Sequence, residues 1–164
     1  MSGFGGAGAF SDGKYNITND FGGTLYEYIG KKKAIELMQY VDTINMAYGG
    51  EGTKMYSTAG TKLKTECLKN KLNLLDASVR HLGTDINYVV LQNLYNELKD
   101  KVDFHFDTPV ADIEVCGDGY RIVCGDAAYE CDKCIISVGR SGSKWMQSVC
   151  RKLDIPTKSN RVDI

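Results

Sequence analysis

The chain has 164 residues and a formal net charge of −1 at pH 7, with 43% hydrophobic and 25% charged residues. These values are ordinary for a soluble globular domain, and the near-zero charge gives no general attraction to nucleic acid or to an anionic membrane. No apolar run approaches the roughly 18 residues that a membrane span needs, and the first nine residues lack the basic start of a secretory signal. We therefore expect a cytoplasmic protein with no nucleic-acid or membrane partner.

Glycine is concentrated at the start of the chain, where eight of the 18 glycines lie within the first 30 residues. Aromatic residues, among them Phe4, Phe10 and Phe21, alternate with these glycines. Flexible linkers rarely carry such side chains, so residues 2–23 are predicted to form a long ordered loop. Close approach of the backbone to a ligand would explain the glycines.

The middle of the chain has helical periodicity. A first helix is predicted from Lys32 to Tyr48 and ends at Gly49 and Gly50. A second is predicted over residues 58–71, with Leu63, Cys67 and Leu68 facing inward, and a strand follows over residues 72–82. A third helix is predicted to start at a cap formed by Thr84 or Asp85 and to end near Lys101, with an apolar stripe of Ile86, Val89, Val90, Leu94 and Leu98.

From residue 102 the period of the apolar residues falls to two. Short strands are predicted over residues 102–106, 109–115, 120–124 and 128–131, with turns at 117–119 and 125–126, which together form a small antiparallel meander. The apolar run 134–138 predicts a strand covered on both faces. A helix capped by Ser141 or Ser143 is predicted to reach Leu153, and residues 161–164 are strand-like.

Six cysteines are present, and four of them lie between Cys116 and Cys134. Cys131 and Cys134 form a Cys-x-x-Cys pair, whereas a zinc ribbon needs two such pairs. We expect free cysteines that pack as small apolar groups. A metal-binding module built on Cys116, Cys124, Cys131 and Cys134 is the alternative.

The segment from Gly3 to Gly8 matches the dinucleotide-binding pattern G-x-G-x-x-G. That fingerprint needs a strand before it and a helix after it, so that the pyrophosphate meets the helix N-terminus. Only two residues precede Gly3, and the residues that follow Gly8 are typical of a loop. We therefore do not assign this segment as a dinucleotide fingerprint.

A wider string, Gly5-Gly6-Ala7-Gly8-Ala9-Phe10-Ser11-Asp12-Gly13-Lys14, is more specific. It resembles the flavin-contacting loop of an uncharacterised family of FAD-dependent dehydrogenases, within the two-dinucleotide-binding flavoprotein class. The resemblance continues at residues 80–85, 109–113, 135–142 and 162–164.

The resemblance implies an α/β fold: part of an FAD/NAD(P)-binding, Rossmann-like domain with an antiparallel β-meander and helical additions. Residues 1–30 would form the glycine-rich flavin-contacting loop, residues 31–83 a helical and strand region toward the substrate, and residues 84–164 part of the FAD-binding domain. The family's nucleotide-binding strand, glycine turn and helix are expected before Met1, and its C-terminal flavin-contacting segment beyond Ile164. We therefore expect the chain alone to be an incomplete and inactive cofactor site, whose partners are the remaining parts of the same flavoprotein.

The resemblance also implies a set of site residues. Hydride or electrons would be transferred between a small-molecule substrate and FAD, with NAD(P)H as a candidate reductant. Arg80 and His81 are the catalytic candidates, because this pair can bind a substrate carboxylate or transfer a proton to the flavin; a surface pair at a strand end is the alternative for them. The cofactor-binding candidates are Gly5, Gly6, Ala7, Gly8, Ser11, Asp12, Gly13, Lys14, Val110, Gly139 and Arg140.

Two other function classes remain open at this point. One is a catalytically inactive folded domain or a small interaction module. The other is the metal-binding module on the four cysteines.

Overall fold

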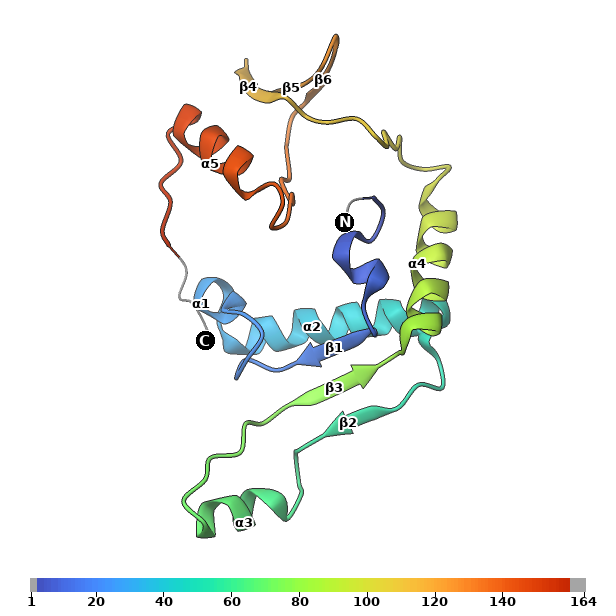
Figure 1. Ribbon diagram of the computed structural model, residues 1–164, viewed down its shortest axis with the longest axis vertical. Coiled ribbons are helices and arrows are strands. Elements are labelled where there is room, and N and C mark those ends of the chain that lie inside the picture. Colours follow the sequence, from blue (N-terminus) through green and yellow to red (C-terminus); the bar gives the residue numbers. More distant parts are fainter. Residues whose placement is uncertain (1–2, 160–164) are drawn as a thin grey trace. The chain divides into compact units, whose positions relative to one another are not determined.

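The computed structural model describes residues 3–159, which form two compact units, one ending at Phe104 and the other beginning at His105 (Figure 1). The protein is mixed α/β, and its described strands form two antiparallel sheets of three strands each. No helix among the described residues is long and apolar enough to cross a membrane.

The sheet of the first unit has the strand order β1-β3-β2, with β1 at Lys14–Ile17, β2 at Met55–Ser57 and β3 at Ser78–His81. Both outer strands run antiparallel to β3. The predicted strand over residues 72–82 is thus confirmed only at its end. β1 and β2 were not predicted, because strands of four and three residues are too short to show a clear period.

Helices surround this sheet. Helix α1 (Leu25–Ile29) leads into α2 (Lys31–Asn45), which packs beside β1 and continues into the turn η2 (Met46–Gly50). The predicted first helix is therefore confirmed, together with its end at the two glycines. At Gly49, φ is +125° and an added Cβ would lie 3.1 Å from Val89 Cγ1, so the chain turns here against helix α4.

Helix α4 (Thr84–Leu98) confirms the third predicted helix. Of its predicted apolar stripe, the side chain of Val90 is fully buried, whereas that of Val89 is exposed. The predicted cap is wrong, because the helix begins after Gly83 and no side chain bonds its first turn. The positive φ of Gly83, +78°, supplies the sharp entry that a capping side chain would otherwise organise.

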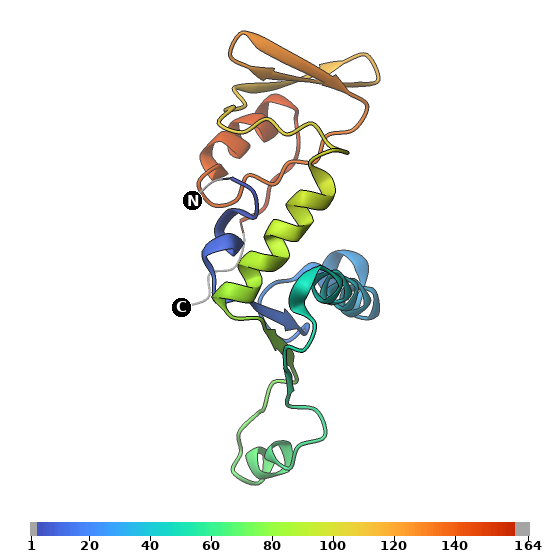
Figure 2. The same ribbon diagram turned by 90° about the vertical axis from the view of Figure 1, so that its right-hand side faces the viewer.

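Between β2 and β3 the chain makes an excursion that carries helix α3 (Leu63–Lys69) and projects away from the sheet (Figure 2). The second helix was thus predicted in the right place but too long. Its orientation was also wrong, because Leu63 and Leu68 are 58% and 64% exposed. An apolar pattern predicts an inward face only where another element covers it.

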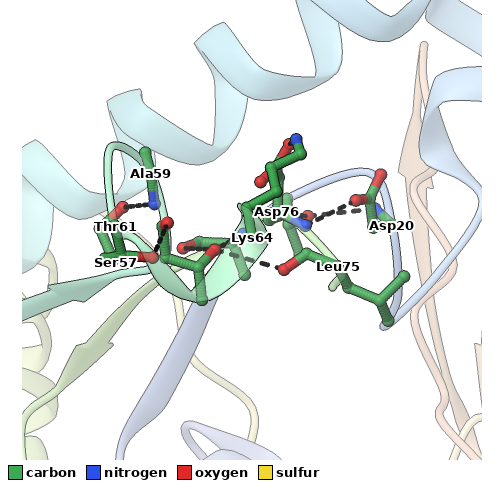
Figure 3. Close-up of polar contacts among 10 residues, drawn as sticks. Asp20, Ser57, Ala59, Thr61, Lys64, Leu75 and Asp76 are labelled. Carbon is green, nitrogen blue, oxygen red and sulfur yellow. Dashed lines mark hydrogen bonds and ion pairs between the residues drawn. The ribbon is translucent and has the colours of Figure 1, made fainter. Parts of the chain in front are cut away.

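Hydrogen bonds close the base of this excursion, where it leaves the sheet (Figure 3). Thr58 Oγ1 accepts a hydrogen bond from the backbone N–H of Ala77 at 3.0 Å and donates to the carbonyl of Leu75 at 3.2 Å. The N–H of Asp76 donates to Asp20 Oδ2 at 2.9 Å, and Lys64 pairs with the Asp76 carboxylate. The excursion is therefore held at its base by polar contacts and not by an apolar core.

The second unit contains the predicted meander. Its strands β4 (Asp112–Cys116), β5 (Gly119–Cys124) and β6 (Ala127–Cys131) pair in sequence order. Helix α5 (Ser143–Lys152) buries Val149 and Cys150, and Trp145 Nε1 donates to the carbonyl of Ala111 at 3.0 Å beside β4. The helix begins after Gly142 with no capping side chain, so the serine cap was wrong.

Two predicted strands do not form. Residues 102–106 are irregular, and the ring of Phe104 instead contacts Phe4 edge to face and Tyr95 in a tilted arrangement, with ring centroids 5.8 and 5.5 Å apart. The run 134–138 is also irregular. Ile135 is 92% exposed, so this run is not covered on both faces as predicted. Residues 161–164, including the resembling segment 162–164, lie outside the described residues.

The Rossmann-like part of the fold prediction is not seen in residues 3–159. A Rossmann sheet is parallel, with a helix crossing between successive strands, whereas every described strand pair is antiparallel. The mixed α/β class and the antiparallel meander are the parts of that prediction that the structure shows.

Thr18, which is 5% exposed, tests the base of the excursion. Its Oγ1 donates to the carbonyl of Asp76 at 2.6 Å and accepts from the N–H of Asp20 at 3.1 Å. Because both partners lose a buried hydrogen bond, we expect Thr18→Val to lower the free energy of unfolding by about 1–3 kcal/mol in urea titration. The matched control Thr43→Val, on the exposed surface of α2, should change it by less than about 0.5 kcal/mol. Equal losses in the two variants would contradict this role.

Candidate functional site

The glycine-rich loop lies along helix α4 and ends at β1. Its central turn is a 3-10 helix, η1 (Gly6–Phe10), which packs beside α4 (Figure 2). Phe4 contacts Tyr95 of α4 edge to face, with ring centroids 5.4 Å apart. The predicted long loop is therefore present, although residues 14–17 within it form β1.

The glycines of this loop divide into two groups. Gly5 and Gly13 have φ of +80° and +67°, and a Cβ at either position would come within 3.0 Å of Leu91 Cδ1 or of Asn87 Cβ, respectively. Close packing against the protein itself accounts for both. A Cβ at Gly6 or Gly8 would instead have no neighbour within 4 Å, so this side of η1 is open.

Pairing of β1 with β3 brings together residues that are far apart in sequence. Lys14 lies directly opposite His81 in this register, and Tyr15 lies opposite Arg80. Opposed residues of an antiparallel pair share a face and successive residues alternate. Since Arg80 bonds helix α2, Lys14 and His81 lie on the other face, where both are exposed.

Asp12 completes this charged group. Its carboxylate lies 2.7 Å from Lys14 Nζ, and both side chains are about half exposed. The hydrogen bond from Lys14 lowers the pKa of Asp12, and the charges of Lys14 and His81 act in the same direction. The structure thus joins three predicted site residues, Asp12, Lys14 and His81, beside the end of the glycine loop.

Ser11 and Ala7 are two further cofactor-binding candidates in the glycine-rich loop. Ser11 Oγ accepts a hydrogen bond from the N–H of Gly13 at 3.0 Å, which organises the turn into β1. Ala7 is exposed on η1. For Ser11 this contact is a structural role beside the predicted cofactor contact.

Arg80 is engaged by the protein through all three guanidinium nitrogens. Its Nε and Nη2 donate to the two carboxylate oxygens of Asp42 at 2.9 and 2.7 Å, and Nη1 donates to the carbonyl of Thr53 at 2.7 Å. The Arg80 and Asp42 side chains are only 13% and 11% exposed. The hydrogen bond to Asp42 raises the pKa of Arg80. The catalytic role predicted for Arg80 stays a prediction, and the observed geometry gives it a structural one.

The remaining cofactor-binding candidates belong to the second unit. Val110 is partly exposed just before β4. Gly139, with φ of +64°, begins a turn in which the carbonyl of Arg140 accepts a hydrogen bond from the N–H of Ser143 at 3.2 Å. The Arg140 side chain is exposed. These three residues therefore belong to a different unit from the group on β1 and β3.

The cysteine-rich sheet of the second unit has a shallow pocket of about 330 Å³, lined in part by Cys116, Cys131 and three acidic side chains. All six cysteines are free. Burial raises the pKa of the Cys134 thiol, and the nearby Cys131 adds to this shift. Within residues 3–159, no group of three or more His, Cys, Asp or Glu side chains is placed to hold a metal ion.

Sequence reasoning missed two buried polar residues that build the site. Asp42 lies within the predicted first helix and Asn87 within the predicted third helix, but neither was predicted as a site residue. Asn87 is fully buried in α4, where Nδ2 donates to the carbonyl of Gly8 at 2.8 Å and Oδ1 accepts from the Tyr15 hydroxyl at 2.9 Å. The available signal was its spacing, four residues before Leu91 on the same helix face.

Comparisons of the chain with protein-family models, with curated proteins and with solved structures found no match.

The Arg80–Asp42 pair has a direct test in stability. Arg80→Met leaves the Asp42 carboxylate buried and unpaired, so we expect the free energy of unfolding to fall by about 3–5 kcal/mol in urea titration. The double variant Arg80→Met/Asp42→Leu should recover most of this loss, because no charge is then left buried. Arg121→Met, at an exposed position of β5, is the control and should leave the free energy of unfolding nearly unchanged. A double variant no more stable than the single one would refute this account.

Burial raises the pKa of the Tyr15 phenol above its ordinary value of 10.0. The unfolded chain therefore ionises first as the pH rises, so the stabilisation from neutral Tyr15 is complete below pH 10 and is lost as pH rises toward the folded-state pKa. We expect the stability advantage of wild type over Tyr15→Phe to shrink as the pH rises above about 10, measured by urea titration. Tyr28→Phe, at a highly exposed position, should show no such change. A pH-independent advantage over Tyr15→Phe would rule out this linkage.

Proposed function

We propose that this chain contributes the flavin-contacting part of an FAD-dependent oxidoreductase, with the open side of η1 against the cofactor. Gly8 carries the proposal. Its φ is not in the left-handed region and a Cβ there would meet nothing, so the fold does not require glycine at this position. Glycine inside a helical turn is destabilising by about 0.5–1 kcal/mol relative to alanine. A ligand that approaches the backbone closely explains why a side chain is absent there.

The charged group beside the loop suits flavin chemistry. FAD would supply the hydride or electron transfer itself, and reduction leaves negative charge on its ring. Lys14 offsets such charge, and His81 is suited to transferring a proton because a ring nitrogen of imidazole can accept or donate one. We carry His81 forward as the catalytic candidate in preference to Arg80, since the guanidinium of Arg80 is occupied by Asp42 and Thr53.

The adenosine half of FAD needs a separate binding element. A parallel βαβ unit that could hold the pyrophosphate is not found in residues 3–159. We propose that other parts of the same flavoprotein supply it, with Val110 near the adenine end, Gly139 close to the cofactor and Arg140 as a phosphate contact, and that NAD(P)H is a candidate electron donor. This assignment rests on the resemblance of Gly5–Lys14 to a flavin-contacting loop.

Titration with FMN and FAD, followed by flavin fluorescence and by amide NMR shifts, tests the proposal. If η1 meets the ring and ribityl chain that both flavins share, the two should bind this chain with similar affinity. Gly8→Leu should weaken both by at least about tenfold, because the new side chain occupies the open side of the turn.

The control for added bulk is Ala128→Leu, on exposed β6, which should bind flavin as wild type does. The Gly8 variant should keep wild-type stability, since its Cβ meets no protein atom within 4 Å. Unchanged flavin affinity in Gly8→Leu, or no binding of either flavin at millimolar concentration, would argue against the flavin assignment. The inactive interaction module would then be the better account.

A further inference from the structure

Three residues of helix α4 form a rail for the glycine loop. Asn87, Leu91 and Tyr95 are spaced four residues apart, so they lie on one face of the helix. Phe4 contacts Tyr95, and Gly5 approaches Leu91. The third contact joins Gly8 to Asn87. The loop therefore runs along the rail toward the N-terminus of α4.

Asn87 is the polar member of this rail, and both polar atoms of its amide are hydrogen-bonded. The carbonyl of Gly8 can only accept, so the atom that faces it at 2.8 Å must be the amide nitrogen. The oxygen then faces the Tyr15 hydroxyl at 2.9 Å, which must donate to it. One buried side chain thereby ties α4 to both the loop and β1.

Packing alone does not require asparagine at this position. A leucine would continue the apolar rail of Leu91 and Tyr95, and a buried amide is costly unless its hydrogen bonds are made. What the amide adds is direction, because a hydrogen bond fixes the carbonyl of Gly8 and hence the orientation of its peptide. A Cβ at Gly8 would have no neighbour within 4 Å, so that side of the residue is open.

We propose that Asn87 is a positioning residue, which holds the Gly8 peptide so that the open side of η1 faces the ligand. This inference rests on the proposed flavin function for its ligand, but not for its effect on the loop. Asn87 has no accessible surface and does not touch the ligand. Its contribution to affinity is therefore indirect, through the order that it gives to the loop.

Two variants separate positioning from stability, because each removes one hydrogen bond of the same amide. Asn87→Asp keeps an acceptor for Tyr15 but loses the donor to Gly8. Tyr15→Phe leaves that donor in place and removes only the bond to the other end of the amide. Amide hydrogen exchange over residues 3–11 reports the loop without any ligand, and FMN titration reports affinity.

We expect Asn87→Asp to raise exchange over residues 3–11 by at least about tenfold and to weaken FMN binding by a similar factor, because the Gly8 carbonyl loses its donor. In Tyr15→Phe both readouts should stay within about twofold of wild type, even where urea titration shows lower global stability. Asn87→Asp also places a carboxylate at a fully buried position, which lowers global stability further. Asn87→Leu loses the same donor to Gly8 without burying a charge, so it should show the same faster exchange over residues 3–11.

The possible results separate this inference from the flavin function. Faster loop exchange in Asn87→Asp but not in Tyr15→Phe supports positioning, and it does so even if wild type binds no FMN, in which case the flavin function alone fails. If wild type binds FMN and Asn87→Asp leaves exchange and affinity unchanged, positioning is overturned and the flavin function stands. Equal effects of the two variants, in proportion to their global stability, also overturn positioning.

Discussion

The buried ion pair between Arg80 and Asp42 sets the geometry on which the first unit depends. Arg80 lies in the central strand β3 and Asp42 in helix α2, and the planar fork of the guanidinium holds both carboxylate oxygens while it also reaches Thr53. Strand β1 takes its register from β3, and that register sets Lys14 opposite His81. The candidate site is therefore positioned by a charge pair that lies on the other face of the sheet.

Two buried polar contacts act at different scales in this unit. Arg80 joins secondary-structure elements, and removing its charge would leave a buried carboxylate that destabilises the whole unit. Asn87 joins a loop to a helix through neutral hydrogen bonds, whose loss is smaller and local. Such a division lets the sheet stay rigid while the loop has a separate, weaker hold. A loop of this kind can adjust to a ligand without disturbing the strands that carry Lys14 and His81.

Periodicity predicted the elements whose apolar pattern extends over several residues, among them α2, α4, β5 and β6. It failed where an apolar run has no cover, as at Ile135, because sequence does not say what lies above a residue. The short strands β1 and β2 exist through their pairing with β3, which is a long-range property. In the site, the sequence located Asp12, Lys14 and His81, but the partners that position them, Asp42 and Asn87, required the fold.

Glycine content alone would have treated every glycine of the N-terminal loop alike, and the structure separates them. Gly13 is fixed by positive φ and by contact with Leu82 and Asn87, so its lack of a side chain is a requirement of folding. Gly8 has neither constraint, and an alanine there would reduce the entropy of the unfolded chain and stabilise an empty loop by about 0.4–1 kcal/mol. A glycine that the fold does not need carries more information about a ligand than one that it does. Gly8 is therefore the glycine of this loop that points most directly to a ligand.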